Sequence, residues 1–165
     1  MDNIDNIIRL DKDDVLRLKL VDDKGNKTGE YLEFDLEDID LKTKYYELLD
    51  KDKKNRKWIQ DELVIIKKRK DVKGEKMPSK NEEDELKAAK KFFEKEVEIY
   101  NMFLGENGVQ KILNGRKLGW ASLVKINKLI DQQILPLLEK KSIEIQNKYK
   151  EIVKNKYTFN SKEEL

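Results

Sequence analysis

The chain has 165 residues, of which 42% are charged and 38% hydrophobic, so it has the length of one ordinary domain with a thin apolar core. It contains no cysteine and no histidine, which excludes disulfides, thiolate or imidazole metal sites, and catalytic triads that depend on either side chain. The net charge of +2 is unevenly spread, because residues 1–40 hold 13 acidic and 6 basic side chains while the remainder is basic.

The N-terminal part of the sequence predicts a flexible arm followed by a β-hairpin. Residues 1–13 are polar and acidic apart from a few aliphatic side chains, and they lack the pattern of a secretory signal. Apolar and polar residues alternate from Val15 to Val21 and again from Glu30 to Leu36, which is the period of a half-buried strand. A turn-forming segment separates them. We therefore expect a hairpin over residues 15–36, whose apolar face needs a helix or another subunit to cover it.

The next segment has a helical period over about residues 40–69. Asp38 or Asp40 can cap its start. Residues 50–57 are almost wholly charged, so the helix can break or protrude there. Trp58 follows this charged stretch, and we interpret it as an anchor in the core.

Residues 67–80 are strongly basic and contain Gly74 and Pro78, which interrupt helices. This composition is typical of a solvated connector. The alternative is a nucleic-acid patch, but no aromatic residue is present for base stacking. We favour the connector, and nucleic acid is not an expected partner.

A second long helix is expected over about residues 80–104. Ser79 and Glu82 have the spacing of a capping box, in which each side chain satisfies a backbone donor near the other residue. The apolar positions at helical spacing predict a buried face formed by Leu86, Ala89, Phe93, Val97 and Tyr100, which Phe92, Phe103 and Leu104 widen.

A glycine-rich corner follows this helix, and it holds one short helical turn at residues 109–113. Glycine ends helices and takes positive φ angles without penalty. We interpret the corner as a packing hinge between two helices. Its structural glycines are Gly105, Gly108, Gly115 and Gly119.

The most apolar helical pattern covers residues 120–138. Pro136 is expected to kink or end this helix. Residues 139–165 predict a basic tail that is either helical or disordered. Residues 14–138 are thus expected to form a single domain. The predicted fold is mainly α (α+β), with an N-terminal β-hairpin followed by a bundle of three to four helices, one of them long and charged.

No catalytic signature is present in the sequence. The four serines lack a serine–lysine motif, and the glycine corner lacks the Gly-Lys-Ser/Thr ending of a phosphate loop. We therefore expect a protein that is not an enzyme, with no cofactor and no bound metal. No run of about 18 apolar residues is available to span a bilayer, so we expect no membrane association.

The corner reads Phe103-Leu-Gly-Glu-Asn-Gly-Val-Gln-Lys-Ile-Leu-Asn-Gly-Arg116, and it leads to an apolar helix. With the strand pair and the charged middle of the chain, it resembles the tail assembly chaperones of long-tailed bacteriophages. In that family a Gly-Glu-x-Gly corner precedes a short turn, another glycine and a closing helix. The resemblance covers about residues 100–140. The charged stretch around residues 50–80 departs from the compact members.

The resemblance implies a non-catalytic morphogenesis factor in the cytoplasm of a bacterial host. Such proteins bind the helical tape measure protein and recruit tail tube subunits around it, and many also have a longer frameshifted form. The charge asymmetry could order copies of the chain into a homo-oligomer, although it is also typical of a solvated helical surface.

Two other functions stay open from the sequence. One is a structural phage accessory protein of the capsid or connector, and the other is a nucleic-acid-binding regulator that uses residues 67–80. For capture of a partner helix, the candidate side chains come from two predicted helices. They are Phe93, Val97, Tyr100, Trp120, Leu123 and Ile130.

Overall fold

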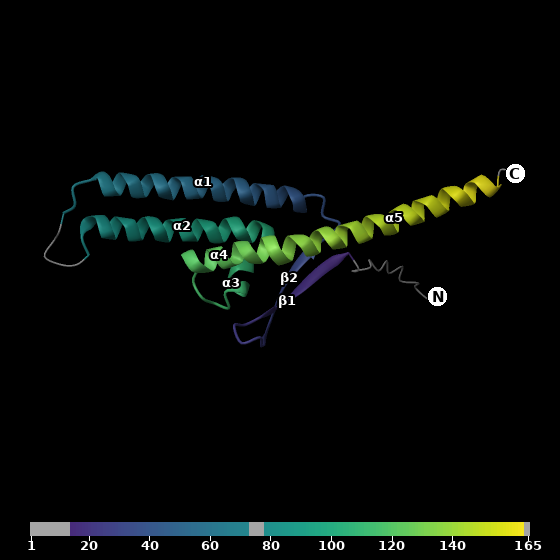
Figure 1. Ribbon diagram of the computed structural model, residues 1–165, viewed down its shortest axis with the longest axis horizontal. Coiled ribbons are helices and arrows are strands. Elements are labelled where there is room, and N and C mark those ends of the chain that lie inside the picture. Colours follow the sequence, from purple (N-terminus) through teal and green to yellow (C-terminus); the bar gives the residue numbers. More distant parts are fainter. Residues whose placement is uncertain (1–13, 73–77, 164–165) are drawn as a thin grey trace, which may run out of the picture.

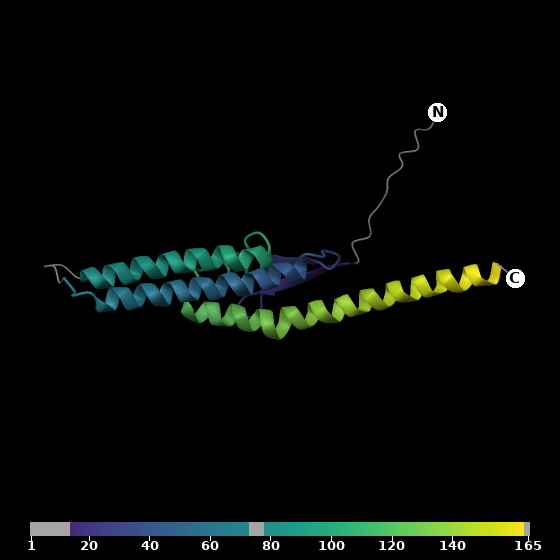
Figure 2. The ribbon, with the colours of Figure 1, turned by 90° about the horizontal axis from the view of Figure 1, so that it is seen from above.

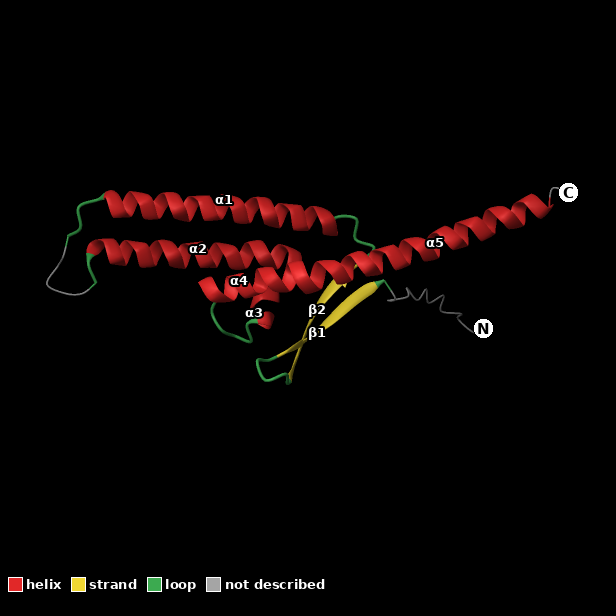
Figure 3. Cartoon of the chain, in the orientation of Figure 1, coloured by secondary structure: helices red, strands yellow, loops and turns green. Residues whose placement is uncertain are grey.

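The computed structural model of the chain describes residues 14–72 and 78–163, with side chains described as far as residue 155. The described chain is mainly helical, with one antiparallel β-hairpin at its N-terminal end, as the sequence predicts (Figures 1 and 3). The predicted arm at residues 1–13 and the middle of the basic connector lie outside the described residues.

The hairpin pairs β1 (Val15–Val21) with β2 (Lys27–Asp35). Their register sets Leu16 opposite Phe34 and Leu18 opposite Leu32, so one face of the sheet is apolar. Leu32 and Phe34 are each only 2% exposed, because α2 and α3 of the same chain lie against this face. The apolar face is therefore covered within one chain and needs no second subunit.

Two long antiparallel helices, α1 (Leu41–Lys68) and α2 (Lys80–Leu104), run side by side and form the main body (Figures 1 and 2). The charged middle of α1 does not break the helix. Its acids and bases pair one turn apart, which favours helix by a few tenths of a kcal/mol per pair. The pairs are Asp50–Lys54, Asp52–Arg56 and Lys57–Asp61.

The two long helices begin differently. Asp40 occupies the N-cap position of α1 without a side-chain cap bond, and Asp38 instead accepts a hydrogen bond from the Asp40 N–H. At the start of α2 the predicted capping box is present, because Ser79 Oγ accepts from the Glu82 N–H and Glu82 accepts from the Ser79 N–H.

The buried face of α2 is turned by about one residue from the predicted one, which is a correction. Leu86 is 66% exposed, while Phe93, Val97 and Ala89 are half-buried. Phe92 and Phe93 are adjacent, so the sequence allows either phase, and packing against α1 selects Phe92. The buried face consists of Ala88, Phe92, Glu96, Ile99, Tyr100, Phe103 and Leu104.

The glycine corner connects α2 to a short α3 (Gly108–Ile112) and then to α4 (Trp120–Leu129). The corner carries the chain back along α2, so that α4 starts beside the middle of α2 and runs in the same direction (Figure 1). Val109 is 1% exposed, and Ile112 and Leu113 pack against the same core. The corner thus packs between the two helices, as predicted.

The helix that begins at Trp120 does not end at Pro136. It passes through a π-helical turn, η1 (Ile130–Ile134), and continues as α5 (Leu135–Glu163). The Leu135 N–H bonds to the Ile130 carbonyl five residues earlier. A wider turn just before a proline reduces the clash of its ring with the carbonyl of residue i−4. Figure 2 shows that the continuous helix formed by α4, η1 and α5 bends near this turn. The expected kink near Pro136 is therefore present, but the helix does not end there.

Beyond its first turns, α5 projects away from the other elements (Figures 1 and 2). Tyr149 links it to the base of the hairpin, since its hydroxyl donates to Glu37 at 3.1 Å and to Asp14 at 3.4 Å. Ile143, Ile152 and other apolar side chains of α5 are about half exposed. Among the described helices, none is both long enough and apolar enough to cross a bilayer.

Candidate functional site

Trp120 is the first residue of α4, and its indole is the exposed end of an aromatic cluster with Phe92 and Phe93 of α2. The indole stacks on Phe92 at 5.1 Å between ring centroids with an interplanar angle of 24°. It meets Phe93 edge-on at 4.8 Å and 68°. The Gly119 N–H donates to Ser122 Oγ at 2.8 Å, which fixes the start of the helix that carries the indole.

This aromatic cluster is half open to solvent. Trp120 is 53% exposed, and so is Val124, one turn further along α4. Phe92 beneath it is completely buried. A large aromatic side chain that is fixed by stacking and still half exposed is typical of an anchor for a partner.

The face of α1 and α2 continues beyond the point where α4 begins (Figure 1). In that direction α2 still has the residues from Lys80 to Lys91, and α1 has its C-terminal turns. Leu86 lies seven residues before Phe93 on the same face of α2 and is 66% exposed. Val64 of α1 is 49% exposed, whereas Ile65 lines a separate shallow groove with Trp58 and Lys91. We call this two-helix part, residues 58–72 and 78–91, the distal arm.

The six predicted partner-binding residues divide into three groups. Tyr100, Leu123 and Ile130 are at most 2% exposed and belong to the core of this chain, so in this conformation they cannot contact a partner directly. Phe93 and Val97 are half-buried beside that core. Only Trp120 presents a large surface to solvent. Of the six candidates, Trp120 is thus the one whose side chain is open to a partner in this conformation.

A buried polar cluster lies between α1 and α2, close to the aromatic cluster. Glu96 has no exposed surface, and its Oε1 accepts a hydrogen bond from Asn55 Nδ2 at 2.7 Å. Its Oε2 has no hydrogen-bond partner within the part of the chain that the structure describes. Burial, and to a smaller extent the neighbouring Asp52 carboxylate, raise the pKa of Glu96 to about 8 against the opposing effects of Asn55 and Arg56. Glu96 is thus mostly protonated at neutral pH.

Polar groups of three helices surround this carboxyl. Arg56 Nε donates to both Asp52 oxygens, at 2.9 and 3.0 Å. The Tyr100 hydroxyl donates to Asn127 Oδ1 of α4. Burial raises the pKa of Tyr100 to about 12, so its hydroxyl stays a donor. The cluster thus joins α1, α2 and α4 through hydrogen bonds between their side chains.

The glycines of the corner have different structural roles. Gly105 has φ 95° and ψ 177°, a region that is nearly restricted to glycine. A Cβ on Gly108 would lie 2.5 Å from Leu104 Cβ, so close packing requires glycine there. Gly115 has φ 81°. Gly119 has an extended backbone, and a Cβ added there would meet no atom within 4 Å. Neither a positive φ nor close packing therefore requires glycine at this position.

Asn101 organises the corner, a role that was not predicted from the sequence. Its Oδ1 accepts the Val109 N–H at 2.8 Å, and its Nδ2 donates to Gln110 at 3.0 Å. It therefore holds α3 against the end of α2. An asparagine in the last turn before a helix-ending glycine was the available signal. The role of Glu96 was also missed, although its four-residue spacing from Phe92 places it on the same helix face.

The basic segment at residues 67–80 is only partly described. Arg69 and Lys80 both contact Asp84, at 2.9 and 3.3 Å, and these cations lower the pKa of that carboxyl. Asn81 donates to the carbonyls of Ile66 and Arg69, which joins the end of α1 to the start of α2. The described part of the segment acts as a helix–helix connection, as favoured above.

Comparisons of the chain with models of known protein families, with curated proteins and with solved structures gave no match.

Proposed function

We propose that this protein is a non-catalytic assembly factor that binds an amphipathic helix of a partner protein along its distal arm, with Trp120 as the anchor. The observation that carries the proposal is the position of Trp120. It is stacked on Phe92, half exposed, and located at the N-terminal end of α4, beyond which α1 and α2 continue without it. A partner helix that continues the line of α4 would bury Leu86, the exposed apolar side chain on the face of α2 that Phe93 shares.

The partner that we propose is the tape measure protein of a bacteriophage tail, with recruitment of tail tube subunits as the biological role. Support comes from the resemblance of residues 103–116 to the corner of tail assembly chaperones. In that resemblance the tape measure protein is a long helical chain that the chaperone keeps soluble. It offers the kind of surface that the distal arm would cover.

Co-expression with the tape measure protein encoded beside this chain tests the proposal. We expect the tape measure protein to become more soluble and to co-elute with this chain on a sizing column. Trp120→Ala should abolish co-elution. Val153→Ser is the matched control, because Val153 is also about half exposed but lies on α5, away from the arm.

Two outcomes would contradict the proposal. One is a tape measure protein that gains no solubility and forms no complex. The other is equal loss of binding in Trp120→Ala and Val153→Ser, which would mean that the aromatic cluster is not the anchor. Stable retention of the chain in purified virions would instead favour a structural accessory protein. A slippery heptanucleotide near the stop codon of the gene would independently favour the chaperone.

A further inference from the structure

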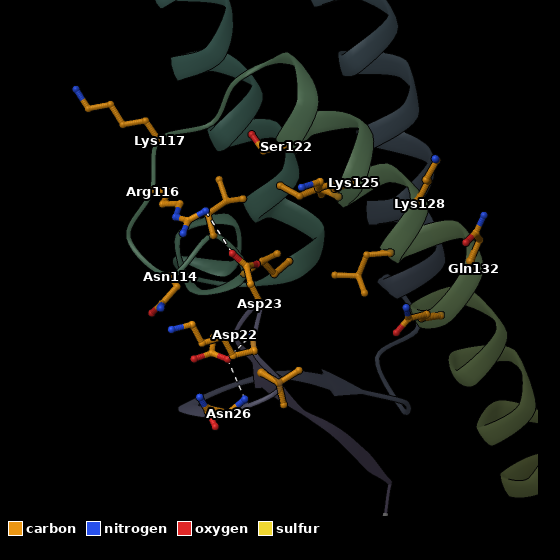
Figure 4. Close-up of a pocket in the computed structure, with 17 residues that line it drawn as sticks. Asp22, Asp23, Asn26, Asn114, Arg116, Lys117, Ser122, Lys125, Lys128 and Gln132 are labelled. Atoms are coloured by element: carbon orange, nitrogen blue, oxygen red, sulfur yellow. Dashed lines mark hydrogen bonds and ion pairs between the residues drawn. The ribbon is translucent and has the colours of Figure 1, made fainter.

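A groove separate from the aromatic cluster lies between the tip of the β-hairpin and the C-terminal half of α4 (Figure 4). Its volume is about 660 Å³, which is within the usual size of ligand-binding pockets. The hairpin turn forms one wall, the loop from Asn114 to Lys117 forms the second, and α4 with η1 forms the third. We call it the turn groove.

The interior of the turn groove is apolar, and basic residues stand along its rim, where Figure 4 shows Lys117 and Lys128 extending away from the hairpin. Ile112, Leu113, Ile126 and Leu129 line the interior and belong to, or pack against, the core. Five basic side chains also line it, against two acidic ones. The basic residues are Lys24, Arg116, Lys117, Lys125 and Lys128.

Both carboxylates of the turn groove already have partners. Asp22 Oδ1 accepts the backbone N–H groups of Lys24 and Asn26, at 2.9 and 2.8 Å, and so closes the hairpin turn. Asp23 pairs with Arg116 at 3.4 Å across the end of the groove, as Figure 4 shows.

The other four cations have no acidic partner among the side chains that the structure describes. Lys24, Lys117, Lys125 and Lys128 pair with no carboxylate among residues 14–72 and 78–155. The groove thus combines an apolar interior with four lysines that have no carboxylate partner among the described side chains. This charge pattern is complementary to a ligand that is both acidic and partly aliphatic.

We infer that the turn groove is a docking site for a short acidic segment of a partner protein, whose carboxylates meet the rim lysines and whose aliphatic side chains enter the apolar interior. A nucleic acid fits this arrangement less well. No aromatic side chain lines the groove for base stacking, and a phosphate backbone would leave the apolar interior unused. The docking site is independent of helix binding at Trp120.

Fluorescence anisotropy on the full chain tests the inference with three labelled probes. The first is a short peptide of alternating Asp or Glu with Leu. The second is the same peptide with Asn and Gln in place of the acids, and the third is a single-stranded DNA oligonucleotide. We expect the acidic peptide to bind at least about tenfold more tightly than either of the others at physiological salt.

A pair of charge-matched variants locates the binding. Lys125→Glu/Lys128→Glu should weaken binding of the acidic peptide by at least about tenfold. Lys140→Glu/Lys148→Glu changes the net charge equally at exposed positions of α5, outside the groove, and should weaken it by less than about twofold. Thermal melts of both variants confirm that they remain folded.

Several results would overturn the inference. Equal binding of the neutral peptide would show that charge is not recognised. Equal weakening of peptide binding in the two double variants would show that the peptide responds to the net charge of the chain and not to the groove. Tighter binding of the oligonucleotide, or no binding of the acidic peptide even at low salt, would exclude an acidic protein segment as the occupant.

Discussion

Asn55 Nδ2 donates a hydrogen bond to Glu96 Oε1 at 2.7 Å and a second one to the Phe92 carbonyl at 3.2 Å. One side-chain amide of α1 thus engages both the backbone and a buried carboxyl of α2. The second carboxyl oxygen of Glu96 has no partner within the described chain. A buried carboxyl with one unsatisfied oxygen is tolerated more easily when it is protonated, so this contact links folding to pH.

The first prediction concerns the pH dependence of stability. The pKa of Glu96 is about 8 in the folded chain against 4.5 for a free side chain, so the folded state holds a proton that the unfolded state releases. The stabilisation is complete below about pH 4.5 and is lost as pH rises toward 8, by up to about 1.4 kcal/mol per pH unit. Glu96→Gln mimics the protonated form. It should melt like the wild type at pH 5 and at a higher temperature at pH 8.5.

Glu94→Gln is the control for this measurement, because Glu94 is exposed on the same helix. Its melting temperature should follow that of the wild type across the whole pH range. If Glu96→Gln loses stability with pH as steeply as the wild type, Glu96 is not the group responsible.

The second prediction separates two glycines of the corner. Gly105→Ala places a Cβ on a backbone with φ 95° and ψ 177°, which should destabilise the fold by about 1–3 kcal/mol. Gly119→Ala has an extended backbone and no atom within 4 Å of the new Cβ, so it should change stability by less than about 0.5 kcal/mol. Urea unfolding of both variants measures the difference. Equal losses of stability in the two variants would show that the backbone conformation does not explain the requirement for glycine at position 105.

Features that depend on local sequence were predicted well. The hairpin was predicted because alternation of apolar residues is specific for a strand with one buried face. The Ser79–Glu82 capping box was predicted because both partners lie within one turn. In each case the residues that decide the structure are neighbours in the sequence.

The end of the helix that starts at Trp120 was predicted wrongly because proline normally stops a helix. The π-helical turn at Ile130–Ile134 adjusts the backbone just before Pro136, and no residue pattern in the sequence marks it. It lets the buried side chains stay on one face across the proline. These are Leu123, Ile126, Ile130, Ile134 and Leu138.

The candidate site was predicted only in part, because burial depends on how α2 is rotated against α1. Adjacent Phe92 and Phe93 allow two helix phases that differ by about 100°. The phase that places Glu96 on the solvent side is favoured by sequence alone, since charged residues are rarely buried. Tertiary contacts with Asn55 and α4 select the other phase, and no single-helix pattern contains them.

The third prediction concerns Tyr149, which joins α5 to the base of the hairpin through Glu37 and Asp14. Tyr149→Phe removes both hydrogen bonds but keeps the ring. Because these groups are exposed, the global melting temperature should change very little. Amide hydrogen exchange in α5 beyond residue 143 should become faster, since the described contacts that hold this part of the helix are few. Unchanged exchange rates would show that Tyr149 does not anchor α5.

The fourth prediction distinguishes the folding and binding roles of the aromatic cluster. Phe92 is completely buried, so Phe92→Ala should destabilise the chain by about 3–5 kcal/mol. Trp120 is half exposed and stacks on Phe92 from one side, so Trp120→Ala should cost no more than about 2 kcal/mol. Denaturant unfolding of the two variants measures these losses. If Trp120→Ala destabilises the chain as much as Phe92→Ala, the indole is a core residue. Loss of partner binding in Trp120→Ala would then result from unfolding and not from a lost contact. A chain that keeps its stability and loses the partner assigns the indole to recognition.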